Sequence, residues 1–431
     1  MTQSINNNVN KSMKRPAAGG WAVRAGLGAV LAIALLAAPG ISAAADKPKG
    51  PEISRVIAKE MTAAQKALQA GQWAEALKNL DEAETKSGLT AFDKKTIYQF
   101  KGFANVKLNN LKVAQGEFEK ALATGAATPE ETASITRTLF GIAASTGQYQ
   151  KTIDFGKQMV DAGTATPDNL AIIAQSYYQL KDCKSSAVWA DKAIAASRKA
   201  GETPKENLYL FKLQCASDAG DTATMDTVLV DLIKLTNKTT YWNTLLRIER
   251  QDERDDHNLL MIYRIMYNTN AMNEGSDYIE MAQLLGDAAL PGEAAAVLDK
   301  AMSGGLIKPE QKERTTRLLA SLKSRADADR KGLPQEDAEA AKSAAGELSV
   351  KLGEVYYGFG DFQKAADAIN AGIQKGQIKH LDEAYVYLGL ADAQLKNYAD
   401  AKKAFANLKS VPNISPRVLK LMELYAEKLG S

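Results

Sequence analysis

One short pattern recurs along this chain and constrains its fold more than any other feature. It consists of Gly or a polar residue, a polar residue, an aromatic or apolar residue, two variable residues and a small residue. Clear copies begin at Gly71, Gly147, Gly360 and Lys396, and weaker copies end at Ala114, Ser186, Met225, Asn258 and Ala294. Successive copies lie 33 to 39 residues apart, except for one interval of 71 residues before the copy that ends at Ala365. An interval of about 34 residues is typical of a repeated helix–turn–helix unit, so the sequence predicts an array of helical hairpins.

The residue types of the pattern suit a helical hairpin. The Gly, Asn or Asp ends the first helix, the aromatic residue packs between the two helices, and the small residue lets their backbones approach closely. Further helix starts are expected at Thr128, Thr166 and Thr203, each followed by Pro, because Thr caps a helix and Pro suits its first turn. Stacked hairpins bury a continuous core, so the predicted fold class is all-α.

The last copy resembles a tetratricopeptide repeat at nearly every signature position. The matching residues are Tyr385, Leu388, Gly389, Ala401, Phe405 and Pro412. The preceding unit keeps Leu352, Gly353, Tyr356, Ala365 and Ile369, and the second unit keeps Tyr98, Gly102, Ala114 and Phe118. The third unit departs from the pattern with Thr152 and Gly156 where Ala and Phe are expected. The resemblance implies a right-handed superhelical solenoid.

The chain also resembles, more diffusely, periplasmic tetratricopeptide proteins encoded beside TonB-ExbB-ExbD energy-transducing systems. The phrases that carry this resemblance are Tyr241-Trp242, residues 278–282 and residues 294–300. It implies an envelope-transport context.

The first 45 residues have the features of a cleavable export signal. Four basic residues precede an apolar run from Ala25 to Ala38, and small residues end at Ala45. A transmembrane anchor is the alternative, but the run is shorter than the roughly 20 residues that cross a bilayer. We expect cleavage after Ala45 and delivery to the periplasm. No second apolar stretch is long enough to hold the mature protein in a membrane.

The remaining sequence is expected to form three parts. Residues 46–302 are predicted to be tetratricopeptide-like repeats, residues 303–345 an irregular helical segment that fits no clean repeat, and residues 346–431 further repeats. The formal charge of +3 is accounted for by the basic residues of the signal, so the mature chain is close to neutral. Its charge gives no reason to expect nucleic acid or an anionic membrane as a partner.

The sequence shows no pattern of catalytic or metal-binding residues. His257 and His380 are the only histidines and belong to different repeats, so their spacing indicates no metal site or catalytic triad. The acidic segment 252–256 lacks the ligand spacing of a calcium loop and is interpreted as a solvated turn between two helices. No nucleotide-binding or nucleophile motif occurs, so we expect neither an enzyme nor a cofactor.

Two classes of function remain open. The first is a scaffold whose concave face holds a peptide or another envelope protein, and the second is a module that binds a non-protein envelope ligand such as peptidoglycan or another polysaccharide. In the solenoid that the resemblance implies, the first helix of each hairpin lines the inner groove. Counting from the Leu-Gly position places these residues on or near that face: Gln99, Phe103, Arg137, Gln175, Tyr178, Gln179, Lys351, Glu354 and Gln394.

The two cysteines of the chain are predicted to form a disulfide. Cys183 lies where a first helix turns into its second, and Cys215 lies late in the first helix of the next unit. These two helix ends are expected to be neighbours, and an oxidising compartment favours pairing. The alternative is that both residues are separate, small, buried apolar side chains.

Overall fold

The computed structural model describes residues 52–411 and 414–430, which form helices and turns with no strand among them. They divide into two compact units, an N-terminal unit up to Cys215 and a C-terminal unit from Ala216 onward. The predicted export signal lies outside the described residues. Within them, no helix combines the length and the apolar character that crossing a membrane would require.

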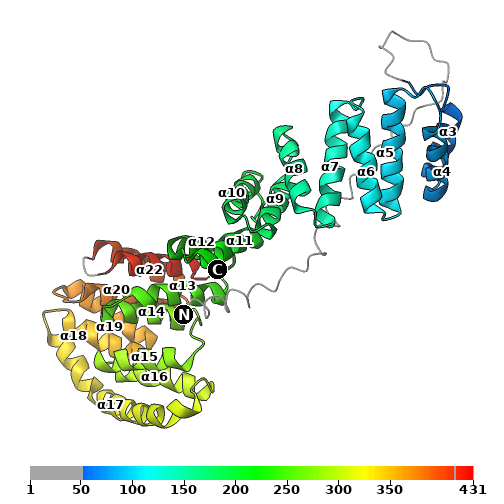
Figure 1. The fold of residues 1–431 in the computed structure, drawn as a ribbon. Coiled ribbons are helices and arrows are strands. Elements are labelled where there is room, and N and C mark those ends of the chain that lie inside the picture. The colour runs from blue at the N-terminus through cyan, green and yellow to red at the C-terminus, as the bar shows by residue number, and fades with distance from the viewer. Residues whose placement is uncertain (1–51, 412–413, 431) are drawn as a thin grey trace. The chain divides into compact units, whose positions relative to one another are not determined.

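Four helical hairpins and most of a further helix make up the N-terminal unit (Figure 1). From α3 to α10, each helix packs against its neighbours in sequence, as in a stack of repeats. The helices are α3 (Ala58–Gln69), α4 (Trp73–Glu84), α5 (Ala91–Lys107), α6 (Leu111–Ala123), α7 (Pro129–Ser145), α8 (Tyr149–Asp161), α9 (Pro167–Gln179), α10 (Cys183–Lys199) and α11 (Glu206–Ala219), within which the division falls.

The C-terminal unit continues the helical pattern and closes on itself. Its last helix, α22, packs against α12 and α14 as well as against α21. The helices are α12 (Thr222–Thr236), α13 (Thr239–Asp252), α14 (Asp256–Asn268), α15 (Gly275–Asp287), α16 (Pro291–Ser303), α17 (Pro309–Lys342), α18 (Glu347–Gly358), α19 (Phe362–Lys375), α20 (Leu381–Gln394), α21 (Tyr398–Asn407), the 3-10 turn η1 (Leu408–Ser410) and α22 (Pro416–Lys428).

The recurring sequence pattern marks the turn inside each hairpin. Its first residue has a positive φ in every copy but the one that ends at Asn258: Gly71, Asn109, Gly147, Lys181, Gly220, Ala289, Gly360 and Lys396. The next residue then donates its N–H to a carbonyl five residues earlier, as Gln72 does to Ala67 at 2.9 Å and Asn397 to Asp392 at 2.8 Å. This hydrogen bond closes the C-terminus of the first helix, so the predicted helix-ending role of the pattern's first residue is confirmed.

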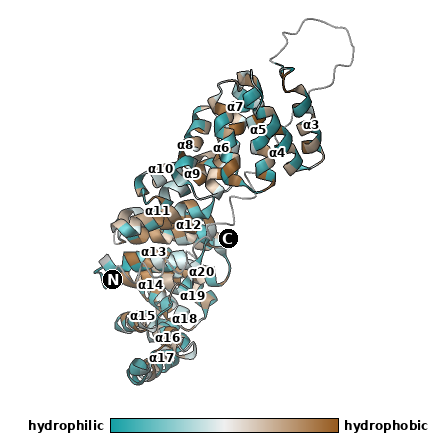
Figure 2. Ribbon diagram, turned by 45° about the vertical axis from the view of Figure 1, so that its right-hand side comes forward, coloured by the Kyte–Doolittle hydropathy of each residue, from teal (hydrophilic) through white to brown (hydrophobic). Residues whose placement is uncertain are grey.

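The helix starts follow the Thr-Pro signals with one shift. Thr128 and Thr166 each accept a backbone N–H and form capping boxes, with Pro at the first helical positions of α7 and α9. The third signal, at Thr203, lies ahead of its helix, because α11 begins only at Glu206. The described helices carry both hydrophilic and hydrophobic residues along their lengths (Figure 2), as expected of helices with one buried face.

A close packing seam joins the two helices of a hairpin. A Cβ on Gly102 would lie 2.8 Å from the Phe118 ring, and one on Gly353 would lie 2.5 Å from Cγ1 of Ile369. In the third hairpin the sizes are exchanged, because Phe140 is the large residue and a Cβ on Gly156 would lie 3.0 Å from its ring and 2.6 Å from Ile173. Gly156, which stands where the repeat pattern has Phe, is therefore compensated by the large Phe140 on the facing helix.

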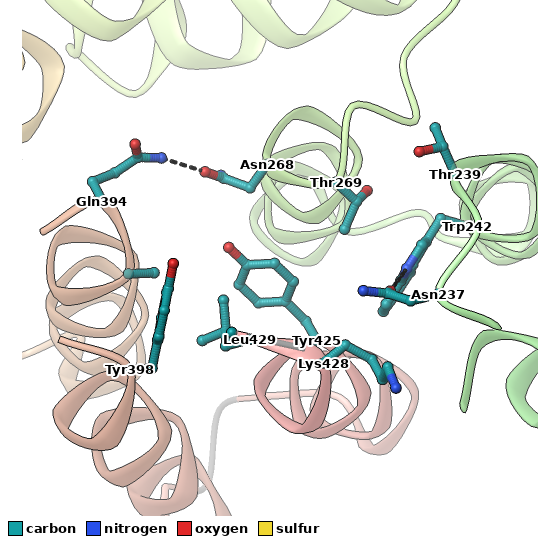
Figure 3. Close-up of a pocket in the computed structure, with 12 residues that line it drawn as sticks. Asn237, Thr239, Trp242, Asn268, Thr269, Gln394, Tyr398, Tyr425, Lys428 and Leu429 are labelled. Carbon is teal, nitrogen blue, oxygen red and sulfur yellow. Dashed lines mark hydrogen bonds between the residues drawn. The ribbon is translucent and has the colours of Figure 1, made fainter. Parts of the chain in front are cut away.

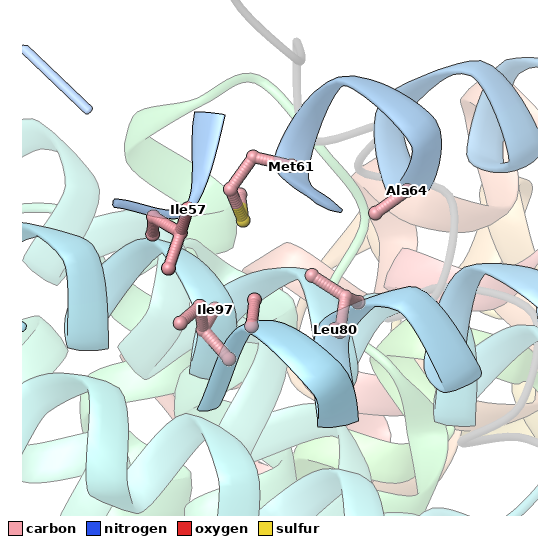
Figure 4. Packing of buried hydrophobic residues seen from close by; sticks show 6 residues of the cluster. Ile57, Met61, Ala64, Leu80 and Ile97 are labelled. Carbon is pink, nitrogen blue, oxygen red and sulfur yellow. The ribbon is translucent and has the colours of Figure 1, made fainter. Parts of the chain in front are cut away.

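The first helices of the N-terminal unit show how such packing seams join into a hydrophobic core. Ile57, Met61 and Ala64 at the start of the stack meet Leu80 of α4 and Ile97 of α5 (Figure 4), and all are buried.

Within the segment 303–345, for which the sequence suggested an irregular helical segment, residues 309–342 form one continuous helix. Helix-forming Ala, Leu, Lys, Arg and Glu dominate it, and Pro334 lies inside it. Because this single 34-residue helix stands where a hairpin is expected, it accounts for the long interval in the sequence pattern.

Candidate functional site

The predicted groove residues of the N-terminal unit all lie on first helices of hairpins, on α5, α7 and α9. Arg137 and Gln179 are exposed, and Phe103, Gln175 and Tyr178 are half-buried. Gln99 is only 9% exposed, so most of its side chain is closed to a partner.

The two aromatic residues of this set are held by neighbouring rings. Phe103 meets Trp73 edge to face with 5.8 Å between ring centroids, and the Lys107 ammonium lies 5.3 Å from the centroid of Phe103. Tyr178 stacks on Phe211 of α11 at 4.8 Å. Rings fixed in this way lose little conformational entropy when a partner packs on them.

Ion pairs of two buried lysines hold α5 in the N-terminal unit, and the sequence pattern did not reveal them. Lys95 of α5 binds Glu131 of α7 at 2.7 Å, although its side chain is only 3% exposed. Lys101, on the same helix, binds both Asp81 and Glu84. The Lys101 pKa is raised by these carboxylates against the effect of desolvation. These contacts fix α5 relative to its neighbours and leave its outer residues in a defined register.

The disulfide between Cys183 and Cys215 is present, with 5.6 Å between the Cα atoms. It ties the first residue of α10 to α11, as expected from the repeat positions.

The predicted groove residues of the C-terminal unit lie against other helices of the same unit. Glu354 is 1% exposed, which removes it from any surface open to a partner. Lys351 binds Glu354 at 2.9 Å and Glu383 of α20 at 3.1 Å. Gln394 donates to the side-chain oxygen of Asn268 at 2.9 Å. The expectation of an open polar groove therefore does not hold for Glu354, because α16 and α20 pack against α18 in this unit.

Helix α14 contacts α20 through side chains at three positions along its length, His257, Arg264 and Asn268. At its start, His257 lies 2.6 Å from Asp382 and 3.1 Å from Glu383. Hydrogen bonds to these carboxylates raise the pKa of His257 to about 9. The Glu383 pKa is lowered to about 2, since the hydrogen bonds and charges of His257 and Lys351 outweigh its burial.

In the middle of α14, Arg264 is fully buried and faces Glu293 of α16 and the hydroxyl of Tyr387 of α20. Tyr387 donates to Glu293 at 2.6 Å. Burial and the neighbouring carboxylate raise the pKa of Tyr387, so the hydroxyl stays a donor. A buried charge needs such partners. The cluster therefore holds α14, α16 and α20 together.

No group of His, Cys, Asp and Glu side chains among the described residues has an arrangement that could hold a metal ion. The acidic segment before α14 is a turn between two helices, as expected. In it, Asp255 accepts the N–H of Asn258 and caps α14.

The chain is similar to solved structures of repeat proteins at low sequence identity. No family profile matches the chain, and no curated protein matches it. Among solved structures, it is similar to a tetratricopeptide repeat protein from Parabacteroides merdae, with 12% identity, 62% of this chain and 99% of that chain covered, and a TM-score of 0.32. It is also similar to the C-terminal part of a TPR repeat-containing protein from Cytophaga hutchinsonii, with 13% identity, 74% and 97% coverage and a TM-score of 0.31. The all-α repeat fold is established here by the helices themselves.

Proposed function

We propose that this chain is an exported tetratricopeptide-type scaffold that holds an extended segment of another protein on the first helices of its N-terminal unit. The observation that carries the proposal is the matching register of accessible side chains on consecutive first helices. Gln175 follows Ala174 as Phe103 follows Gly102, and exposed Arg137 lies three residues before Phe140, in the register that the buried Gln99 takes before Gly102. Because Phe140, Gly102 and Ala174 occupy equivalent seam positions, these side chains repeat along the stack.

The chemistry of these side chains suits a peptide. Carboxamides such as those of Gln175 and Gln179 offer both donors and acceptors to an extended backbone, while Phe103 and Tyr178 offer apolar contact. Arg137 adds one exposed cation. The set contains no nucleophile paired with a base, which favours binding over catalysis.

The finer proposal is that the partner belongs to the cell envelope and that the chain supports a transport system of the TonB type. The apolar run and small residues before position 45 support export, and an internal disulfide suits an oxidising compartment. The diffuse resemblance to periplasmic proteins of such systems supports the envelope-transport context.

Crosslinking in the native envelope, followed by capture of the chain and mass spectrometry, tests the proposal. The double variant Arg137→Ala/Gln179→Ala changes only exposed residues and should keep its helical circular dichroism and Tm while losing most of the crosslinked partner. Adding Phe103→Ala should remove the remainder. A matched control changes exposed Lys112, Val113 and Val188 on second helices α6 and α10 to Ala. Capture that survives in the folded triple variant, or falls equally in the control, would place the site elsewhere.

A further inference from the structure

A pocket in the C-terminal unit lies where several helices end, and neither the sequence pattern nor the proposed scaffold role uses it. Its volume is about 350 Å³, at the small end of the range for ligand sites, about 300 to 1,000 Å³. Residues at the C-terminal ends of α12, α14, α20 and α22 and at the starts of α13 and α21 line it. Figure 3 shows the tyrosine rings of α21 and α22 between these helix ends.

Two tyrosines, Tyr398 and Tyr425, line this pocket. Tyr425 is only 6% exposed, and its ring extends into the pocket from α22 toward Asn268 (Figure 3). The hydroxyl groups of Tyr425 and Tyr398 make no hydrogen bond to another described residue, and both residues line the pocket, so a molecule in the pocket can pair with these hydroxyls. Burial raises the pKa of Tyr425 to about 12, so its hydroxyl remains a hydrogen-bond donor at neutral pH.

Amides and hydroxyls form most of the remaining polar lining. Gln394 gives its amide N–H to Asn268, which leaves its carbonyl oxygen as an acceptor. Asn237 accepts the indole N–H of Trp242 at 2.9 Å. This hydrogen bond fixes the side of the pocket that these two residues line. Thr239 adds an exposed hydroxyl.

The charges of the pocket favour an uncharged ligand. None of the residues that line it is acidic, and Lys428 is the one cation in the lining. Lys428 already donates to the carbonyl of Lys234 at 3.1 Å. The C-terminal ends of four helices add negative partial charge, which the starts of α13 and α21 and the Lys428 ammonium offset. The lining therefore has no strong charge of either sign with which to hold an anion or a cation.

We propose that this pocket binds a single ring of a neutral saccharide. Sugar hydroxyls both donate and accept, so they complement the Tyr425 and Tyr398 hydroxyls on one side and the Gln394 carbonyl on another. The tyrosine rings supply apolar contact for the C–H faces of the sugar. The site is distinct from the first-helix face of the N-terminal unit and does not depend on the scaffold role.

Ligand-observed NMR and calorimetry on the purified chain test this, with D-glucose and N-acetyl-D-glucosamine as neutral probes and D-glucuronate as the anionic one. We expect weak binding of at least one neutral sugar and weaker binding of glucuronate. Tyr425→Phe should lower the affinity about five- to tenfold, the effect of one lost hydrogen bond. Its Tm should stay equal or rise, since the hydroxyl has no partner among the described residues to lose. Tyr398→Phe should act in the same direction.

Tyr278→Phe is the matched control. Its hydroxyl is buried, lies outside the pocket lining and donates to the carbonyl of Met272 at 3.3 Å, so this variant should lose Tm and keep sugar binding. The proposal is overturned if glucuronate binds more tightly than the neutral sugars, if Tyr425→Phe binds like the wild type, or if no neutral probe binds at tens-of-millimolar concentration.

Discussion

Gly389 of α20 lies directly against the ring of Phe405 of α21, so closely that a Cβ on Gly389 would stand 2.6 Å from Cζ of the ring. The ring is itself almost fully buried and meets Tyr425 edge to face at 5.7 Å. Phe405 therefore cannot withdraw without disturbing its contact with α22. Glycine is required here by space, and not by a left-handed backbone, since Gly389 lies inside a helix.

Gly389→Ala should therefore destabilise the chain despite the higher helix propensity of Ala. Overpacking of a tight seam costs about 1 to 3 kcal/mol, measurable as a loss of unfolding free energy in urea. Gly116→Ala is the control, because Gly116 lies in α6 and a Cβ there would meet nothing within 4 Å. That change should be neutral or stabilising by up to about 1 kcal/mol. Equal effects of the two changes would contradict the packing argument.

The disulfide between Cys183 and Cys215 should leave no titratable thiol in the denatured, unreduced protein. Its residues are 32 apart, and closing a loop of this size contributes about 3 to 4 kcal/mol in the chain-entropy model. Replacing both cysteines by Ser should lower the unfolding free energy by about that amount. The finding of two free thiols before reduction would show that the bond does not form.

The contact of His257 with Asp382 and Glu383 should make stability fall at alkaline pH. The folded-state pKa of about 9 lies above the ordinary value of 6.5, so the folded chain retains a proton that the unfolded chain releases between these values. The stabilisation is complete below pH 6.5 and is lost as the pH rises through about 9. The expected slope is at most about 1.4 kcal/mol per pH unit.

Chemical denaturation of wild type and His257→Gln across this pH range measures the effect. The variant should be less stable at pH 6.5 and should show a flatter pH dependence. His380→Gln is the control, since the His380 ring lies 6.1 Å from that of His257 but makes no ion pair to a described residue. An unchanged slope in His257→Gln would assign the pH dependence to another group.

Glu293→Ala should be strongly destabilising because it leaves the Arg264 charge buried without its carboxylate. Breaking a buried pair from one side costs about 3 to 5 kcal/mol. Arg317→Ala is the comparison, since its pair with Glu313 is exposed, with side chains 73% and 85% accessible, and such pairs contribute about 0.5 kcal/mol or less. Urea denaturation distinguishes the two, and similar midpoints for both variants would contradict the role of the buried cluster.

Much of the fold could be predicted because it is set by interactions within about one repeat. Positive-φ residues such as Gly71 and Lys396 end first helices through a local hydrogen bond, and Gly102 faces Phe118 across a single turn. The pairing of Cys183 with Cys215 follows from adjacent repeats in the same way. All of these contacts depend on residue types at fixed spacings, which a sequence displays directly.

The closure of the C-terminal unit depended on the tertiary structure. His257 meets Asp382 across 125 positions, and Gln394 meets Asn268 across 126. In the sequence these residues resemble ordinary polar positions on amphipathic helices, because no local spacing records that α14 and α20 become neighbours. Each repeat determines only how it packs on the next one, and the direction in which many repeats curve is the sum of small rotations. The sequence by itself therefore determined the hairpins and their seams, whereas the three-dimensional path of the chain decided which polar residues are buried in ion pairs and which remain open to a ligand.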